Sequence, residues 1–278
     1  MTEYAMPNVL VETQWLADHL DDPTVRIIEV DMSPESHKDA HIPGAIFWNF
    51  MVDLMQPNFQ LNLDVSAMEA LLSRAGITPQ TTVVAYGSYP GTGGCIFWLL
   101  KLFGHEDVRV LNGSHRKWMA ENRPVSGDLS TYAATDYSVK SPLDQSLRVD
   151  VAEVKTAVSD ADYVLLDVRS TAEFRGEQFL MKPPEGDERA GHIPGAVHIE
   201  LDRTLTEAGT FKSFDVLKSL FLEYDVTPDK KIFPYCAVGA RAGYAWFVLT
   251  YLLGYPNVRN YDGSWNEWSR LPETAVET

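Results

Sequence analysis

Short apolar runs alternate with amphipathic stretches along the 278-residue chain. Four runs of five or six residues are mostly apolar and have the length of buried strands: 25–30, 82–86, 163–168 and 231–235. Apolar positions at helical spacing predict four helices: 66–75, 96–103, 214–224 and 242–253. Strands that alternate with helices predict an α/β fold, in which a mainly parallel sheet is flanked by helices on both faces.

The second half of the chain repeats the first. The motif His-Ile-Pro-Gly-Ala occupies residues 41–45 and again 192–196, and Gly-Ser-x-x-x-Trp occupies 113–118 and 263–268. Matches in the same order at nearly constant spacing indicate a duplication. We therefore expect two tandem domains, residues 1–124 and 148–278. The polar, turn-rich segment 125–147 is the expected linker.

The second copy contains an insertion before its His-Ile-Pro-Gly-Ala motif. From the acidic strand residue to the motif histidine is 25 residues in the second copy (167 to 192) and 12 in the first (29 to 41), so 13 residues are extra, within 176–189. Long loops inside compact domains often carry function. Arg189 is therefore a candidate substrate contact, and Lys182 is a second one. Arg169, which aligns with Asp31, either faces the site or forms a salt bridge.

A single cysteine stands where a reactive site is expected in such a sheet. Cys236 directly follows the predicted strand 231–235, and a helix begins soon after it. Unpaired backbone N–H groups and the helix dipole at this position stabilise a thiolate. Small loop residues let the backbone curl around an anion, and an arginine adds a cation. We expect Cys236 to be the nucleophile and the next five residues to bind the substrate: Ala237, Val238, Gly239, Ala240 and Arg241.

The first copy serves as an internal control. Its Gly87 aligns with Cys236, and its Thr92 aligns with Arg241. The first copy thus keeps the strand and the helix but lacks both the nucleophile and the cation. We expect it to be a catalytically inactive support. Cys95 falls on the helix of this copy, where core packing is its expected role.

Composition excludes some classes of partner and indicates a cellular compartment. With 39 acidic and 23 basic residues the formal net charge is −16, which argues against nucleic acid or an anionic membrane as a partner. No run is apolar and long enough to predict a transmembrane helix, and the first residues do not resemble a signal peptide. Two cysteines indicate a reducing compartment, so we expect a cytoplasmic protein. No metal-ligand spacing is present, and we expect no metal and no cofactor.

The motifs of both halves resemble those of the two-domain rhodanese-type sulfurtransferases, which use thiosulfate or 3-mercaptopyruvate. The resemblance runs from about residue 9 to residue 268 and includes the acidic strand ends, the turn 191–196 and the segment 263–268. In that family a six-residue loop opens with the catalytic cysteine, which matches 236–241 here. The resemblance implies two tandem rhodanese-like domains, an active site at their interface and a persulfide on Cys236.

The spacing within the loop bears on its chemistry. Phosphatases of the same fold use Cys-x5-Arg, and the shorter Cys-x4-Arg found here favours sulfur transfer. Relatives that use mercaptopyruvate tend to carry a threonine where this chain has Arg241, which favours thiosulfate as donor and a thiophilic acceptor such as cyanide. However, Glu173 stands where vertebrate relatives carry an arginine, and Val238 replaces a basic loop residue. A 3-mercaptopyruvate donor and a persulfide relay to a protein acceptor therefore remain alternatives.

Overall fold

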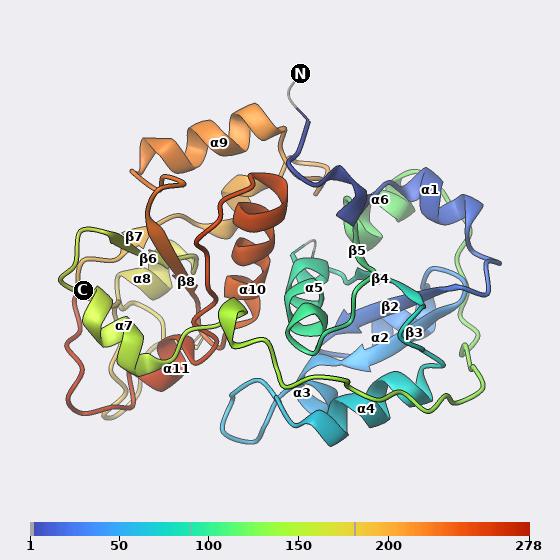
Figure 1. Cartoon of the computed structure of the whole chain (residues 1–278), viewed down its shortest axis with the longest axis horizontal. Coiled ribbons are helices and arrows are strands. Elements are labelled where there is room, and N and C mark those ends of the chain that lie inside the picture. The colour runs from blue at the N-terminus through green and yellow to red at the C-terminus, as the bar shows by residue number, and fades with distance from the viewer. Residues whose placement is uncertain (1–2, 90, 181) are drawn as a thin grey trace.

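The computed structural model describes residues 3–89, 91–180 and 182–278, and it consists of two α/β halves (Figure 1). The first half contains a five-stranded parallel sheet of order β1-β5-β4-β2-β3. Its strands are β1 (Leu10–Val11), β2 (Val25–Asp31), β3 (Ala45–Asn49), β4 (Thr82–Tyr86) and β5 (Val108–Leu111). The sheet of the second half has the order β7-β6-β8 and is also parallel. Its strands are β6 (Tyr163–Asp167), β7 (Val197–His198) and β8 (Lys231–Tyr235).

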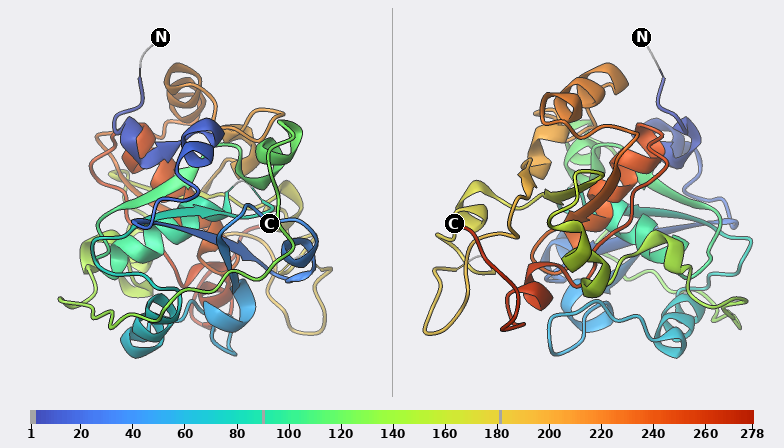
Figure 2. Two further views of the ribbon diagram at one scale, coloured as in Figure 1. Left: turned by 90° about the vertical axis from the view of Figure 1, so that its right-hand side faces the viewer. Right: turned by 60° about the vertical axis from the view of Figure 1, so that its left-hand side comes forward.

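Helices lie on both sides of the sheets (Figure 2). In the first half they are α1 (Thr13–Asp18), α2 (Glu35–Asp39), α3 (Phe50–Asp53), α4 (Val65–Arg74), α5 (Thr92–Leu102) and α6 (Ser114–Ala120). In the second half they are α7 (Val151–Ala157), α8 (Thr171–Phe174), α9 (Phe214–Glu223), α10 (Ala240–Phe247) and α11 (Ser264–Trp268). Short 3-10 turns occur at Pro7–Val9, Gln145–Leu147 and Leu201–Thr204. The central strands β4 and β8 are almost entirely buried because helices cover both faces, so the predicted fold class is confirmed.

The duplication is visible in the strand order. Beside β8, single parallel bridges join Ile232 to Val258 and Arg148 to Asn260. These bridges stand where β4, β5 and β1 pair in the first half. The second sheet therefore continues past β8 in the order of the first, with strands too short to be assigned.

The two halves meet along α5 and α10, which lie next to each other at the centre of the molecule (Figure 1). Gly94 of α5 faces Tyr244 of α10, and a Cβ atom on Gly94 would lie 2.7 Å from the tyrosine ring. Gly243 of α10 in turn faces Cys95 of α5. Glycine at these two matched positions lets the helices approach closely. The predicted helix 242–253 is interrupted, because α10 ends at Phe247 and continues as a wider π-type turn over Val248–Leu252.

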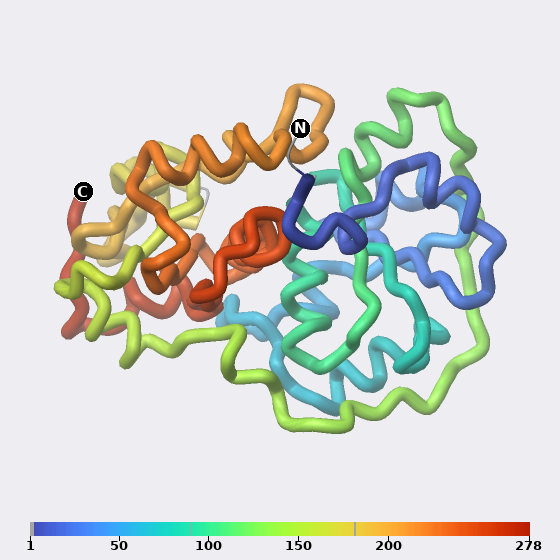
Figure 3. Tube along the Cα trace, turned by 45° about the horizontal axis from the view of Figure 1, so that its top comes forward, coloured from blue at the N-terminus to red at the C-terminus, as the bar shows by residue number. Residues whose placement is uncertain are grey.

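The expected linker runs along the outside of the first half (Figure 3). Ser126 and His41 exchange two backbone hydrogen bonds of 2.9 Å, and the Arg26 guanidinium lies 3.8 Å from the centre of the Tyr132 ring. Segment 125–147 thus packs on the first half before the chain enters the second. The domain boundaries at 124 and 148 stay a prediction.

Candidate active site

Cys236 lies at the carboxyl end of β8 and is only 1% exposed. Its Sγ accepts a hydrogen bond of 3.2 Å from the backbone N–H of Gly239. Its own N–H donates to Ser264 Oγ at 3.0 Å, and its carbonyl accepts from the N–H of Trp265 at 2.9 Å. The start of α11 therefore holds the backbone of the cysteine in place.

The loop that follows Cys236 can bind an anion. Gly239 has φ +91°, and a Cβ atom there would lie 2.4 Å from the carbonyl oxygen of Asp262, so this position requires glycine. Four backbone N–H groups of the loop have no hydrogen-bond acceptor among the described residues. They belong to Ala237, Val238, Ala240 and Arg241. Together with the N-terminus of α10, these donors favour a negatively charged ligand.

The serine that supports Cys236 has a counterpart in the first half. Ser114 accepts a hydrogen bond of 3.0 Å from the N–H of Gly87, which is the residue aligned with Cys236. Both serines adopt positive φ angles, 55° for Ser114 and 52° for Ser264. The first copy has glycine in place of the cysteine, yet it keeps the hydrogen bond from the backbone N–H to the serine Oγ. This hydrogen bond therefore shapes the loop and does not by itself indicate a catalytic role. Its retention explains why both halves share the Gly-Ser-x-x-x-Trp motif.

Arg241 is paired with Glu173 rather than free. Its two terminal nitrogens donate to the two oxygens of the Glu173 carboxylate at 2.8 and 2.7 Å. The Glu173 side chain is 3% exposed and that of Arg241 is 29% exposed. Burial opposes the charge on Glu173, but the hydrogen bonds and charge of Arg241 outweigh it and lower the pKa of Glu173 to about 2. Sequence reasoning did not predict this pairing, since the partners lie on separate elements.

Arg169 forms a buried salt bridge, one of the two alternatives that the sequence left open. Its guanidinium donates to Asp167 at 2.6 Å and to the carbonyl of Gly191 at 2.7 Å. It also lies 4.7 Å from the centre of the Trp265 ring. These contacts join the end of β6 to the turn before residue 192 and to α11. Arg169 thereby fixes these three segments relative to one another.

The cations of the insertion contact other segments. Arg189 donates to the carbonyls of Leu271 at 2.6 Å and of Thr274, which holds the C-terminal segment. Lys182 pairs with Glu185 at 3.2 Å. Within the described part of the chain, neither cation has a hydrogen bond to loop 236–241. Contact between Arg189 and a substrate stays a prediction.

Two contacts between the halves, both missed by sequence reasoning, involve Asn266 and Asp202 of the second half. The Asn266 side-chain amide donates to the carbonyls of Asn58 and Phe59 at 3.0 and 3.2 Å, while its N–H donates to the Ala237 carbonyl. The Tyr89 hydroxyl donates to Asp202 at 2.6 Å. The loop 236–241 thus borders the interface between the two halves, as the resemblance implies.

Cys95 is a packing residue in this arrangement. It is 3% exposed and forms no disulfide. Burial, and next the charge of Cys236, raise the pKa of its thiol to about 12, so it is neutral near pH 7. In residues 3–89, 91–180 and 182–278 no group of three or more His, Cys, Asp or Glu side chains could hold a metal ion. None of the helices described is long and apolar enough to cross a membrane.

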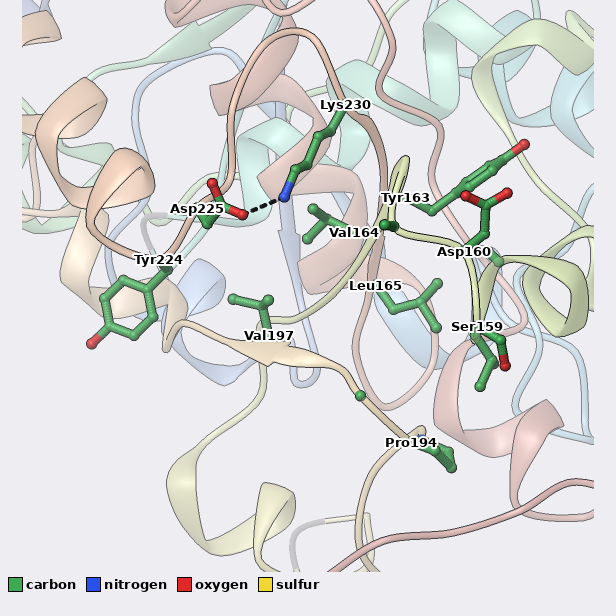
Figure 4. Close-up of a pocket in the computed structure, with 14 residues that line it drawn as sticks. Ser159, Asp160, Tyr163, Val164, Leu165, Pro194, Val197, Tyr224, Asp225 and Lys230 are labelled. Atoms are coloured by element: carbon green, nitrogen blue, oxygen red, sulfur yellow. Dashed lines mark hydrogen bonds and ion pairs between the residues drawn. The ribbon is translucent and has the colours of Figure 1, made fainter.

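A cavity of about 440 Å³ lies at the opposite end of the second sheet (Figure 4). Its lining includes Tyr163, Val197 and Lys230, and Lys230 pairs with Asp225, which also lines it. Lys230 precedes β8 and Cys236 follows it, so roughly 20 Å of extended strand separates them. This cavity is therefore separate from loop 236–241.

Comparison with known proteins agrees with this geometry. The Rhodanese-like domain family matches residues 12–121 and 150–271. A "Sulfur carrier protein TtuD" of Thermus thermophilus is 42% identical, with 96% of each chain covered. A "Thiosulfate sulfurtransferase" of Corynebacterium glutamicum is 37% identical over 99% of this chain and 92% of its own. A solved structure of EanB with a cysteine persulfide and ergothioneine superimposes with a TM-score of 0.88 at 26% identity, covering 100% of this chain and 72% of that one.

Proposed function

Because the chain belongs to the rhodanese-like family as a two-domain sulfurtransferase, we propose that it transfers the outer sulfur of thiosulfate through a persulfide on Cys236. The observation that carries this proposal is the position of Cys236. Its sulfur accepts a hydrogen bond from Gly239 at 3.2 Å, in a loop with four further N–H donors available to an anion. The first half contains no equivalent nucleophile, since Gly87 takes the place of the cysteine.

The reaction proceeds as two displacements. The Cys236 thiolate attacks the outer sulfur of thiosulfate, a sulfur–sulfur bond forms to Cys236, and the original sulfur–sulfur bond breaks with its electron pair leaving on sulfite. A thiophile such as cyanide then attacks the terminal sulfur, leaves as thiocyanate and regenerates the thiolate. The loop N–H groups stabilise the charge that develops on the transferred group. The two steps balance without an oxidant, a metal or a cofactor.

A persulfide relay is a second candidate, supported by the similarity to a relative named as a sulfur carrier protein. In this case the acceptor is a protein cysteine in place of cyanide, and the first displacement is unchanged. The two candidates differ in turnover, because a relay passes sulfur slowly to small thiophiles. The donor 3-mercaptopyruvate stays an alternative to thiosulfate, and a cytoplasmic location stays a prediction.

Steady-state rates with thiosulfate, 3-mercaptopyruvate and an aryl phosphate, each with cyanide where sulfur is transferred, test the proposal. We expect thiosulfate to give the highest kcat/KM and the phosphate to give none. Cys236→Ser should abolish sulfur transfer, whereas the matched control Cys95→Ser should keep most of it. Comparable losses in both variants, or faster turnover of 3-mercaptopyruvate, would contradict the proposal.

A further inference from the structure

The cation of the catalytic loop is held in a neutral pair. Both terminal nitrogens of Arg241 are bound to both oxygens of Glu173. The carboxylate is also anchored from its own side, because the N–H and the hydroxyl of Ser170 each donate to it at 3.0 Å. Glu173 is therefore fixed by α8 and its N-cap independently of Arg241.

This arrangement determines the charge that a donor meets. An anion in loop 236–241 approaches backbone N–H groups, but the guanidinium of Arg241 on this loop lies 2.7 Å from the carboxylate of Glu173, so the two charges cancel in large part. The coulombic energy between Glu173 and a donor is proportional to the charge of the donor. Thiosulfate carries two negative charges, so Glu173 opposes it about twice as strongly, in free energy, as it opposes a donor with one charge.

We propose that Glu173 tunes the donor specificity of the Cys236 site: by neutralising Arg241 it reduces, without reversing, the advantage that a doubly charged sulfur donor has over a singly charged one. Glu173 acts here by offsetting the charge of Arg241 and by holding its guanidinium in place, and it does not itself touch the reacting sulfur. The inference rests on the proposed function, in which the loop accepts thiosulfate.

Glu173→Gln is the direct test, because glutamine keeps the shape of the side chain and an oxygen for Ser170. Persulfide formation is measured with thiosulfate, a dianion, and with methanethiosulfonate, a monoanion that donates sulfur in the same way. We expect the KM for thiosulfate to fall about tenfold and that for methanethiosulfonate about threefold, since half the charge gives half the free energy. The change in kcat should be smaller than the change in KM.

Glu153→Gln provides a matched control. Glu153 forms the same two-point pair with Arg259, at 2.6 and 2.9 Å, but its side chain is 46% exposed. The substitution changes the net charge of the protein by the same amount. It should leave both KM values within about twofold, because water and salt screen an exposed pair.

Arg241→Gln should change both KM values in the opposite direction, and this test does not depend on whether Glu173→Gln folds. It leaves Glu173 uncompensated, so the KM for thiosulfate should rise about tenfold and that for methanethiosulfonate about threefold. The KM values of the double variant should lie between those of the two single variants. Damage to the fold would instead impair both donors equally and would lower kcat.

The outcomes separate this inference from the proposed function. If the unmodified protein forms no persulfide with either donor, the proposed function fails. If it does form one, but Glu173→Gln raises the KM for thiosulfate or changes both donors by the same factor, the specificity role of Glu173 is wrong while the proposed function stands.

Discussion

The buried pair of Glu173 and Arg241 should make the stability of the protein depend on pH below 5. Glu173 has a pKa of about 2 in the folded protein, against an ordinary value of 4.5. At about 1.4 kcal/mol for each pH unit, this difference corresponds to roughly 3 kcal/mol of stability. Because the folded pKa is the lower one, that stability is fully present above pH 4.5 and is lost as the pH falls toward 2. About 1.4 kcal/mol of it should be gone by pH 3.5.

The measurement is urea unfolding followed by tryptophan fluorescence at pH 7 and pH 3.5, for the unmodified protein and for Glu173→Gln. The variant has no carboxyl at this position, so the stability difference between the two proteins isolates the contribution of Glu173. We expect that difference to shrink by about 1.4 kcal/mol on going to pH 3.5. The exposed control Glu153→Gln should change stability by less than about 1 kcal/mol at either pH. A difference between the unmodified protein and Glu173→Gln that stays constant over this range would refute the reasoning.

Three further substitutions test how the site is built. Gly239→Ala should lower kcat/KM for thiosulfate more than about tenfold. The added Cβ would lie 2.4 Å from the Asp262 carbonyl oxygen, at a position with a left-handed backbone conformation. Activity near that of the unmodified protein would argue against the loop geometry. Tyr89→Phe removes the hydrogen bond to Asp202 between the halves, a loss of about 1 kcal/mol of stability. It should therefore lower Tm by about 2–4 °C in a thermal melt. An unchanged Tm would mean that this contact does not hold the halves together. Gly94→Ala places a methyl group against the facing ring of α10 and should destabilise the protein by about 1–3 kcal/mol in urea unfolding; a stabilised variant would contradict the close packing of α5 on α10.

The strands and the duplication could be predicted because they depend on local pattern. The runs 82–86 and 231–235 were predicted as strands and match β4 and β8. The position of Cys236 followed from the same pattern, because the residue after a buried strand that leads into a helix lies at the end of the sheet. The fold class and the place of the cysteine in the loop were thus accessible without coordinates.

The partners of the side chains were not accessible in this way. The terminal nitrogens of Arg241 are bound by Glu173 of α8, which no pattern in the sequence indicated, and contact between Arg241 and a substrate stays a prediction. Tyr89 and Phe59 reach the second half across an interface that no periodicity within one half can reveal. Such contacts depend on how elements far apart in sequence are placed, and the repeat fixes placement only within each copy.

The local pattern also failed where a helix changes its pitch. Residues 242–253 have continuous helical spacing, yet the chain widens into a π-type turn at Val248–Leu252. Apolar residues remain buried on both sides of this turn, so the hydrophobic pattern does not distinguish the two geometries.

The most direct test of the central claim is the mass of the peptide that contains Cys236. After incubation with thiosulfate and removal of the excess, this peptide should gain one sulfur atom, about 32 Da, and cyanide should remove it with release of thiocyanate. The peptide that contains Cys95 should stay unmodified, since its thiol is buried and neutral. Continued turnover of thiosulfate with an unmodified Cys236 peptide, or sulfur found on Cys95 instead, would contradict the account.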